Sequence, residues 1–256
     1  MDLATMHPSA LRLPAAILCA CAISMPVAIA ADGPPRPRVE RVKFDQGATS
    51  ATIKATQKGG ADVDYVVRAA AGQTLEVRLQ ASNPQSDFNV LPPGSKDVAM
   101  HIGDGAAYKA MLPSDGDYTI RVYLNRAAAR RNESSKYTLT VGVTGRALPP
   151  LAAAKDARVK GTPYNATASI PCQPPFAAAM KTCDAGVIRR GTDGTATMEV
   201  RGSNGVVRRI LFVAGKPIVS DAAVTLLSFT REGDATIVKV GEDERYDVPD
   251  ALLRGG

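Results

Sequence analysis

Few residues of this sequence could carry out acid–base or nucleophilic chemistry. Its 256 residues include two histidines, and only His101 lies beyond the first thirty residues. A hydrolase triad built on His101 would need a partner acid and a nucleophile elbow, but the sequence contains no Gly-x-Ser-x-Gly. We therefore expect a protein that is not an enzyme, with His101 as an ordinary strand residue.

The acidic residues do not follow a metal-binding pattern. No His-Glu-x-x-His or EF-hand spacing is present. The densest acidic group, residues 242–244 with Asp247 and Asp250 close behind, is more typical of a solvated turn than of a calcium site. The sequence predicts neither a metal nor a cofactor.

Four cysteines fall into two pairs. Cys19 and Cys21 lie in the N-terminal segment, whereas Cys172 and Cys183 lie in the second half of the chain. An even pair in an exported chain favours a disulfide, and two thiols are too few for a structural zinc site. We expect a Cys172–Cys183 bridge that contributes about 3 kcal/mol of stability.

The most unusual polar segment is Arg-Ala-Ala-Ala-Arg-Arg-Asn at residues 126–132. If its alanine-rich middle takes one helical turn, Arg126 and Arg130 project from the same side. Composition alone favours a solubilising loop.

The N-terminal segment indicates export. Residues 13–30 carry no charge and are followed by Ala31 and Asp32, which is typical of a cleaved signal peptide over residues 1–31. A membrane anchor and lipid attachment at Cys21 are the alternatives. Residues 32–38 are rich in proline and are expected to form an extended leader, and the mature chain is expected to have no membrane span.

Alternating apolar and polar residues predict an all-β protein. Residues 39–144 contain many short alternating runs separated by turn residues, which favours an antiparallel, immunoglobulin-like β-sandwich. The expected strands cover residues 39–44, 50–55, 63–69, 74–80, 87–91, 97–102, 107–112, 119–124 and 136–143. Tyr118 is expected to make a structural corner hydrogen bond.

The second half predicts another small β-rich domain. Residues 145–156 lose the alternation and contain two adjacent prolines, so we expect a linker there and a domain of unknown role over residues 157–256. Asn204-Gly205 predicts a hairpin turn in a meander that ends near Val248. The one helix candidate covers residues 175–182. The formal net charge of +6 permits anionic partners, but aromatic residues make up 5%, which argues against nucleic-acid binding.

Residues across about 38–145 resemble the periplasmic inhibitors of goose-type (g-type) lysozyme. The most specific match is Arg-x-x-x-Arg-x-Asn at residues 126–132, which follows the expected strand that contains Arg121 and Val122. The other matching positions are residues 41–44, 47, 50–51, 71–73, 88–94, 112–113, 116, 118, 121–122 and 136–137.

The resemblance implies a β-sandwich whose loops at one end block the substrate cleft of a g-type lysozyme, with Arg126 and Arg130 as the binding residues. One position departs from the family, because Gly60 stands in a loop where the family offers an aromatic contact. A non-catalytic module that binds carbohydrate or the cell envelope is the alternative. Oligomeric state does not follow from the sequence.

Overall fold

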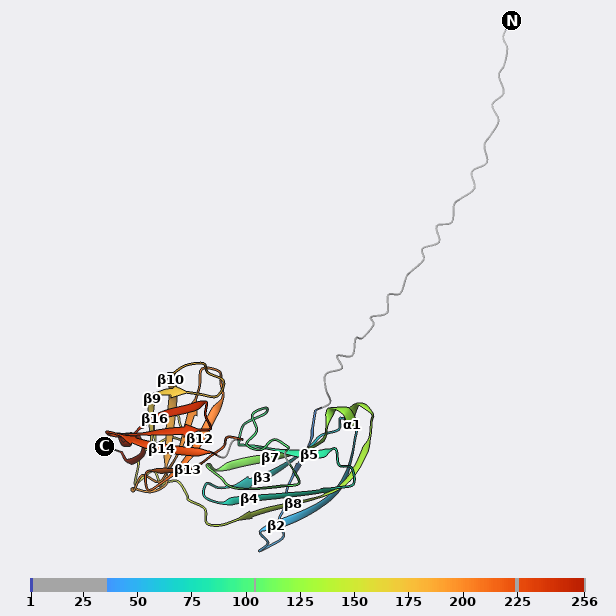
Figure 1. Ribbon diagram of the computed structural model, residues 1–256, viewed down its shortest axis with the longest axis horizontal. Coiled ribbons are helices and arrows are strands. Elements are labelled where there is room, and N and C mark those ends of the chain that lie inside the picture. The colour runs from blue at the N-terminus through green and yellow to red at the C-terminus, as the bar shows by residue number, and fades with distance from the viewer. Residues whose placement is uncertain (2–35, 104, 224–225, 256) are drawn as a thin grey trace. The chain divides into compact units, whose positions relative to one another are not determined.

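The computed structural model describes Met1 and residues 36–103, 105–223 and 226–255. The expected signal peptide and Cys21 lie outside these residues, as does most of the expected leader. Residues 34–256 form one compact unit. Its strands are arranged in two four-stranded sheets and one eight-stranded sheet (Figure 1), so the expected all-β class is confirmed.

The first two sheets pack face to face as a β-sandwich. One has the strand order β1-β3-β7-β5 and the other β2-β8-β4-β6. All pairs within them are antiparallel except β1 with β3, which is parallel. The elements are β1 (Arg38–Arg41), β2 (Ser50–Lys58), β3 (Val63–Ala69), β4 (Thr74–Ala81), β5 (Ser86–Leu91), β6 (Ala107–Met111), β7 (Gly116–Leu124), α1 (Arg126–Arg130) and β8 (Ser134–Thr144).

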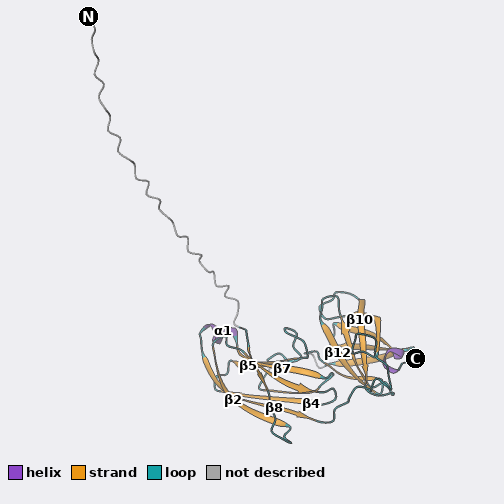
Figure 2. Ribbon diagram, turned by 180° about the vertical axis from the view of Figure 1, so that it is seen from behind, coloured by secondary structure: helices purple, strands orange, loops and turns teal. Residues whose placement is uncertain are grey.

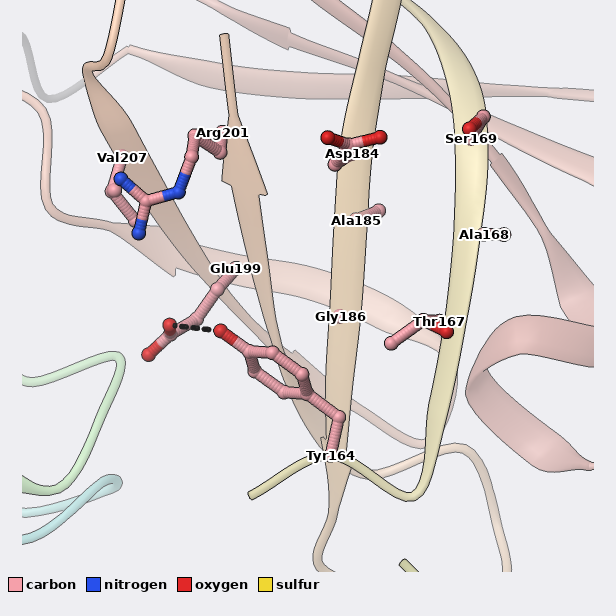
Figure 3. A pocket seen from close by; sticks show the side chains of 10 residues that line it. All are labelled: Tyr164, Thr167, Ala168, Ser169, Asp184, Ala185, Gly186, Glu199, Arg201 and Val207. Atoms are coloured by element: carbon pink, nitrogen blue, oxygen red, sulfur yellow. Dashed lines mark hydrogen bonds between the residues drawn. The ribbon is translucent and has the colours of Figure 1, made fainter. Parts of the chain in front are cut away.

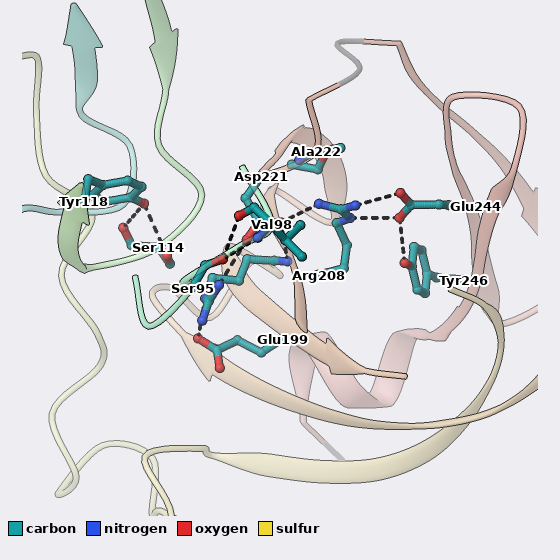
Figure 4. A network of polar contacts seen from close by, with 12 residues as sticks. Ser95, Val98, Ser114, Tyr118, Glu199, Arg208, Asp221, Ala222, Glu244 and Tyr246 are labelled. Atoms are coloured by element: carbon teal, nitrogen blue, oxygen red, sulfur yellow. Dashed lines mark hydrogen bonds and ion pairs between the residues drawn. The ribbon is translucent and has the colours of Figure 1, made fainter. Parts of the chain in front are cut away.

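Strand alternation places one face of each sheet in a shared apolar core. In β7, Tyr118, Ile120 and Val122 are fully buried, and the residues between them are only partly buried. Burial of an apolar side chain of this size is worth about 1.5–3 kcal/mol, so this interface is the main source of the sandwich's stability. As expected, the Tyr118 hydroxyl donates to the Ser114 carbonyl oxygen at 2.8 Å (Figure 4).

The eight-stranded sheet contains every strand after residue 165. Its order is β13-β12-β11-β10-β9-β16-β15-β14, and the two edge strands β13 and β14 approach each other, so the sheet nearly closes into a barrel (Figure 2). The elements are β9 (Ala166–Gln173), β10 (Lys181–Arg189), β11 (Ala196–Arg201), β12 (Val207–Val213), β13 (Lys216–Ser220), β14 (Leu227–Glu232), β15 (Ala235–Val240), β16 (Glu244–Pro249) and α2 (Asp250–Arg254).

The disulfide and the hairpin of this sheet agree with the sequence. Cys172 and Cys183 are bonded, with their Cα atoms 5.8 Å apart on the paired strands β9 and β10. The Asn204-Gly205 turn joins β11 to β12, and Gly205 has the positive φ of 78° that such a turn requires. The expected linker, residues 145–156, contains no strand. After the linker, the fully buried side chain of Arg190 forms an ion pair with Asp115 at 2.9 Å.

Two predicted elements are wrong. Residues 97–102 do not form a strand: the Ser95 hydroxyl closes a turn with Val98, and only an isolated bridge joins His101 to Val90. Residues 175–182 do not form a helix, because Phe176 has a φ of 66° and β10 already begins at Lys181. In both segments a local turn replaces the regular pattern.

The acidic group near residue 244 is also not simply a solvated turn. Glu244 is 7% exposed and accepts two hydrogen bonds from Arg208, at 2.7 and 2.8 Å (Figure 4). Asp221 is fully buried and bonds to both Arg208 and Arg209. Burial disfavours these charges, and hydrogen bonding between them compensates for the loss of water.

Candidate functional site

A one-turn helix lies at one end of the sandwich, between β7 and β8 (Figure 1). Asn125 caps this helix, α1: its side-chain oxygen accepts a hydrogen bond from the Ala128 amide at 3.0 Å. The Asn125 side-chain amide in turn bonds to Gln85 in the β4–β5 turn. Ala128 is fully buried, so the apolar side of the turn faces the sandwich. The cap and this contact fix the orientation of the helix.

Arg126 and Arg130 lie four residues apart on this turn, and both are exposed. Residues four apart are neighbours on a helix surface. The structure thus brings together the two arginines that the sequence singled out. Within the described residues neither guanidinium makes an ion pair or a side-chain hydrogen bond, so their donors face solvent.

The end of α1 is held by a small polar network. Arg131 bonds to one carboxylate oxygen of Glu133 at 2.6 Å, and the side-chain amide of Asn83 bonds to the other at 2.8 Å. The hydrogen bond from Asn83, followed by that from Arg131, lowers the pKa of Glu133 below its ordinary value. The carboxylate therefore stays charged in mildly acidic solution and keeps the chain after α1 in place.

The β2–β3 turn lies beside the end of α1. The Gly59 amide donates to the Glu133 carbonyl oxygen at 2.9 Å. A Cβ atom at Gly59 would lie 2.7 Å from the side-chain oxygen of Asn132, whereas a Cβ atom at Gly60 would meet nothing within 4 Å. Gly59 is therefore required by its surroundings, and Gly60 faces open space.

Sequence reasoning found the two arginines but missed the residues that position them. Asn125 could have been recognised, because asparagine directly before a helical turn is a common N-cap. Gln85 gives no such signal, since its contact with Asn125 spans 40 positions in the chain. Its role appears only once the β4–β5 turn is placed next to α1.

His101 is positioned for packing. Its ring lies 5.0 Å from the ring of Phe88 and 5.0 Å from that of Tyr108, measured between centroids. These are ordinary distances for packed aromatic rings. Among the residues described here, no group of three His, Cys, Asp or Glu side chains could hold a metal ion, and no helix is long and apolar enough to cross a membrane.

Several solved structures are similar to the first part of the chain. PliG of Aeromonas hydrophila, a periplasmic lysozyme inhibitor of g-type lysozyme, is 34% identical over 43% of this chain and 98% of its own, with a TM-score of 0.41. PliG of Salmonella Typhimurium, with the same description, is 30% identical over 42% of this chain and 98% of its own, with a TM-score of 0.34. A mutant of the Escherichia coli protein gives the same values.

These similarities concern less than half of the chain, and the remainder has no counterpart in the three inhibitors. No protein-family model matches the chain, and a search of curated proteins also finds no match.

Proposed function

The chain belongs to the family of periplasmic lysozyme inhibitors of g-type lysozyme, and on this premise we propose that it is an exported inhibitor that blocks the substrate cleft of such a lysozyme. The blocking surface is the α1 end of the sandwich. Arg126 and Arg130 are the binding residues, and the protein acts without performing a reaction of its own.

The observation that carries this proposal is the pair of exposed arginines on a fixed helical turn, which have no acidic partner among the residues that the structure describes. Glycoside hydrolases cleave their substrates with carboxyl groups set in a cleft. A guanidinium can bind such a carboxylate through two parallel, charge-assisted hydrogen bonds. Because neither arginine is paired within the described part of the chain, neither has to break an ion pair there before binding.

The position of α1 supports the same proposal. Contacts with Gln85 and Glu133 hold the turn before a partner arrives, so little conformational freedom remains to be lost on binding. The neighbouring β2–β3 turn would extend the contact surface and exclude water from the arginines. Exclusion of water strengthens charge-assisted hydrogen bonds within an interface.

The proposed location of the inhibitor is the periplasm, reached through cleavage of the signal peptide over residues 1–31. The Cys172–Cys183 disulfide supports an oxidising compartment, because such bonds rarely persist in the cytosol.

The decisive experiment is the titration of a g-type lysozyme with the protein lacking residues 1–31. We expect stoichiometric loss of g-type activity, with chicken-type and invertebrate-type lysozymes much less affected. Absence of inhibition of the g-type enzyme would overturn the proposal.

The proposed binding residues are tested by Arg126→Ala combined with Arg130→Ala. The double variant should raise the inhibition constant at least about a hundredfold, since truncating a buried interface arginine costs about 2 kcal/mol or more. Arg158→Ala combined with Lys160→Ala is a matched control, because it removes the same charge from exposed positions outside α1. Full inhibition by the Arg126/Arg130 variant would exclude this site.

A further inference from the structure

A concave site lies on the outer face of the eight-stranded sheet. It is a hollow of about 410 Å³ that spans β9 to β12 (Figure 3). That volume falls within the range of small-molecule sites, about 300–1,000 Å³. In β10 the core side of the sheet carries Cys183 and Val187, which are buried, while Asp184 and Gly186 lie on the side of the hollow.

The floor of the hollow is the ring of Tyr164 lying flat on a glycine. A Cβ atom at Gly186 would lie 2.5–2.6 Å from three ring atoms of Tyr164, so only glycine leaves room for the ring. The Tyr164 hydroxyl reaches across β10 and donates to Glu199 at 2.9 Å (Figure 3). Packing on Gly186 and the hydrogen bond to Glu199 hold the ring in place. The ring stays partly exposed and lines the hollow.

The Tyr164 hydroxyl keeps its proton over the physiological range. Burial, together with the negative charge of Glu199, raises the pKa of Tyr164 to about 12. The hydroxyl is thus a permanent donor to Glu199, and the orientation of the ring does not change with pH near neutrality.

A row of polar side chains crosses the sheet beside this ring. Asp184 pairs in register with Ser169 on one side and with Arg201 on the other. All three are exposed and line the hollow. Despite their adjacency, Asp184 and Arg201 form no ion pair with each other, and within the described residues neither side chain has another polar partner. A carboxylate, a guanidinium and a hydroxyl are therefore available to a ligand.

The combination restricts the chemistry of that ligand. The carboxylate of Asp184 disfavours a phosphate group, and the charged side chains of Asp184 and Arg201 disfavour a purely apolar molecule. A sugar ring has one face of C–H groups, which can lie on an aromatic ring, and a rim of hydroxyl groups, which both donate and accept hydrogen bonds. The Asp184 carboxylate can accept hydrogen bonds from sugar hydroxyl groups, and the Arg201 guanidinium can donate hydrogen bonds to them.

We propose that this hollow is a carbohydrate-binding site, in which a sugar ring stacks on Tyr164 while its hydroxyl groups bond to Asp184 and Arg201. The site is separate from α1, so the chain carries a glycan-binding surface in addition to the proposed inhibitory end. Glycans built from N-acetylated amino sugars and plain glucans share this chemistry.

The experiment is a nuclear magnetic resonance titration of the protein lacking residues 1–31 with three probes. These are a chitin tetrasaccharide, soluble peptidoglycan glycan strands and maltotetraose. Binding should shift the amide signals of residues 167–169, 184–186 and 199–201, and the probe that binds best identifies the glycan class. No shift at these positions with any probe at millimolar concentration would overturn the proposal.

Variants then test the assigned contacts. Tyr164→Ala and Arg201→Gln should each weaken saccharide binding about tenfold or more. Phe229→Ala is the matched aromatic control, because Phe229 is 40% exposed on β14, away from the hollow, and should leave binding unchanged. Arg201→Gln changes an exposed side chain that has no polar partner in the described ranges, so it should fold normally even if Tyr164→Ala does not. Unchanged binding by folded Arg201→Gln would contradict the assignment.

Discussion

Gly59 and Gly60 are adjacent residues with opposite tolerance for a side chain. Gly59 has a φ of 56° and would bring a Cβ atom to 2.7 Å from Asn132, whereas Gly60 is open on all sides. The sequence drew attention to Gly60 because the inhibitor family offers an aromatic contact in this loop. The structure adds that the missing side chain could be restored there without displacing any neighbour.

We predict that Gly60→Tyr strengthens inhibition of a g-type lysozyme. An aromatic side chain beside the arginines would add about 1 kcal/mol of contact energy, which lowers the inhibition constant roughly fivefold. Gly59→Tyr is the control, and it should weaken inhibition because it displaces Asn132 and strains the turn. An inhibition constant unchanged by Gly60→Tyr, measured by titration of lysozyme activity, would contradict the prediction.

At the scale of the element, α1 is too short to be stable by itself. Isolated helices of fewer than about 12 residues are marginal in water, so this five-residue turn depends on its cap and its buried alanine. The Asn125 side chain caps the helix through its oxygen and bonds to Gln85 through its amide nitrogen.

Asn125→Ala should therefore loosen the turn without unfolding the sandwich. Loss of an N-cap costs about 1 kcal/mol, so amide hydrogen exchange at Ala128 should accelerate roughly fivefold. Asn125→Ser keeps a capping oxygen but loses the Gln85 contact, and should lie between the wild type and Asn125→Ala. If Ala128 exchanges at the same rate in all three proteins, the cap does not hold α1.

The polar network at the end of α1 should respond to acid. Because the folded-state pKa of Glu133 is lowered, its stabilising contribution is complete above its ordinary pKa of 4.5 and is lost as the pH falls through the lowered value. A carboxyl titration followed by nuclear magnetic resonance should give a midpoint below 4.5 for Glu133. Asn83→Ala removes one of its two donors and should move that midpoint upward; an unchanged midpoint would contradict the assignment.

At the scale of the whole molecule, two separate apolar clusters stabilise the chain. The sandwich has its own core, and the eight-stranded sheet has a second core that includes the disulfide. Beside the second core lies the buried ion network of Arg208, Asp221 and Glu244. Removal of Arg208 would leave Glu244 buried without a cationic partner, whereas Asp221 would keep its ion pair with Arg209.

Arg208→Ala should lower the free energy of unfolding by about 3–5 kcal/mol, because it leaves Glu244 buried without a cationic partner. Arg231→Ala removes an exposed pair with Asp250 and should cost less than about 1 kcal/mol. Urea denaturation of both variants checks the difference. Equal losses would mean that the buried network contributes no more than a surface pair.

The sequence by itself determined the features that depend on neighbouring residues. Alternation identified most strands, Asn204-Gly205 identified a hairpin, and the spacing of Arg126 and Arg130 placed them on one side of a turn. Each is a local pattern, fixed by the geometry of a strand or a helix. The Cys172–Cys183 pair followed from their number and the expected compartment.

The tertiary structure decided everything that depends on residues far apart in the chain. Alternation over residues 97–102 resembled a strand, but those residues find only one bridging partner. Glu244 looked solvated until Arg208, 36 positions away, was placed beside it. Likewise, Tyr164 lines a site only because Gly186 on a paired strand leaves space for its ring. A local pattern fixes which way a side chain points, whereas its partner depends on how the strands pair.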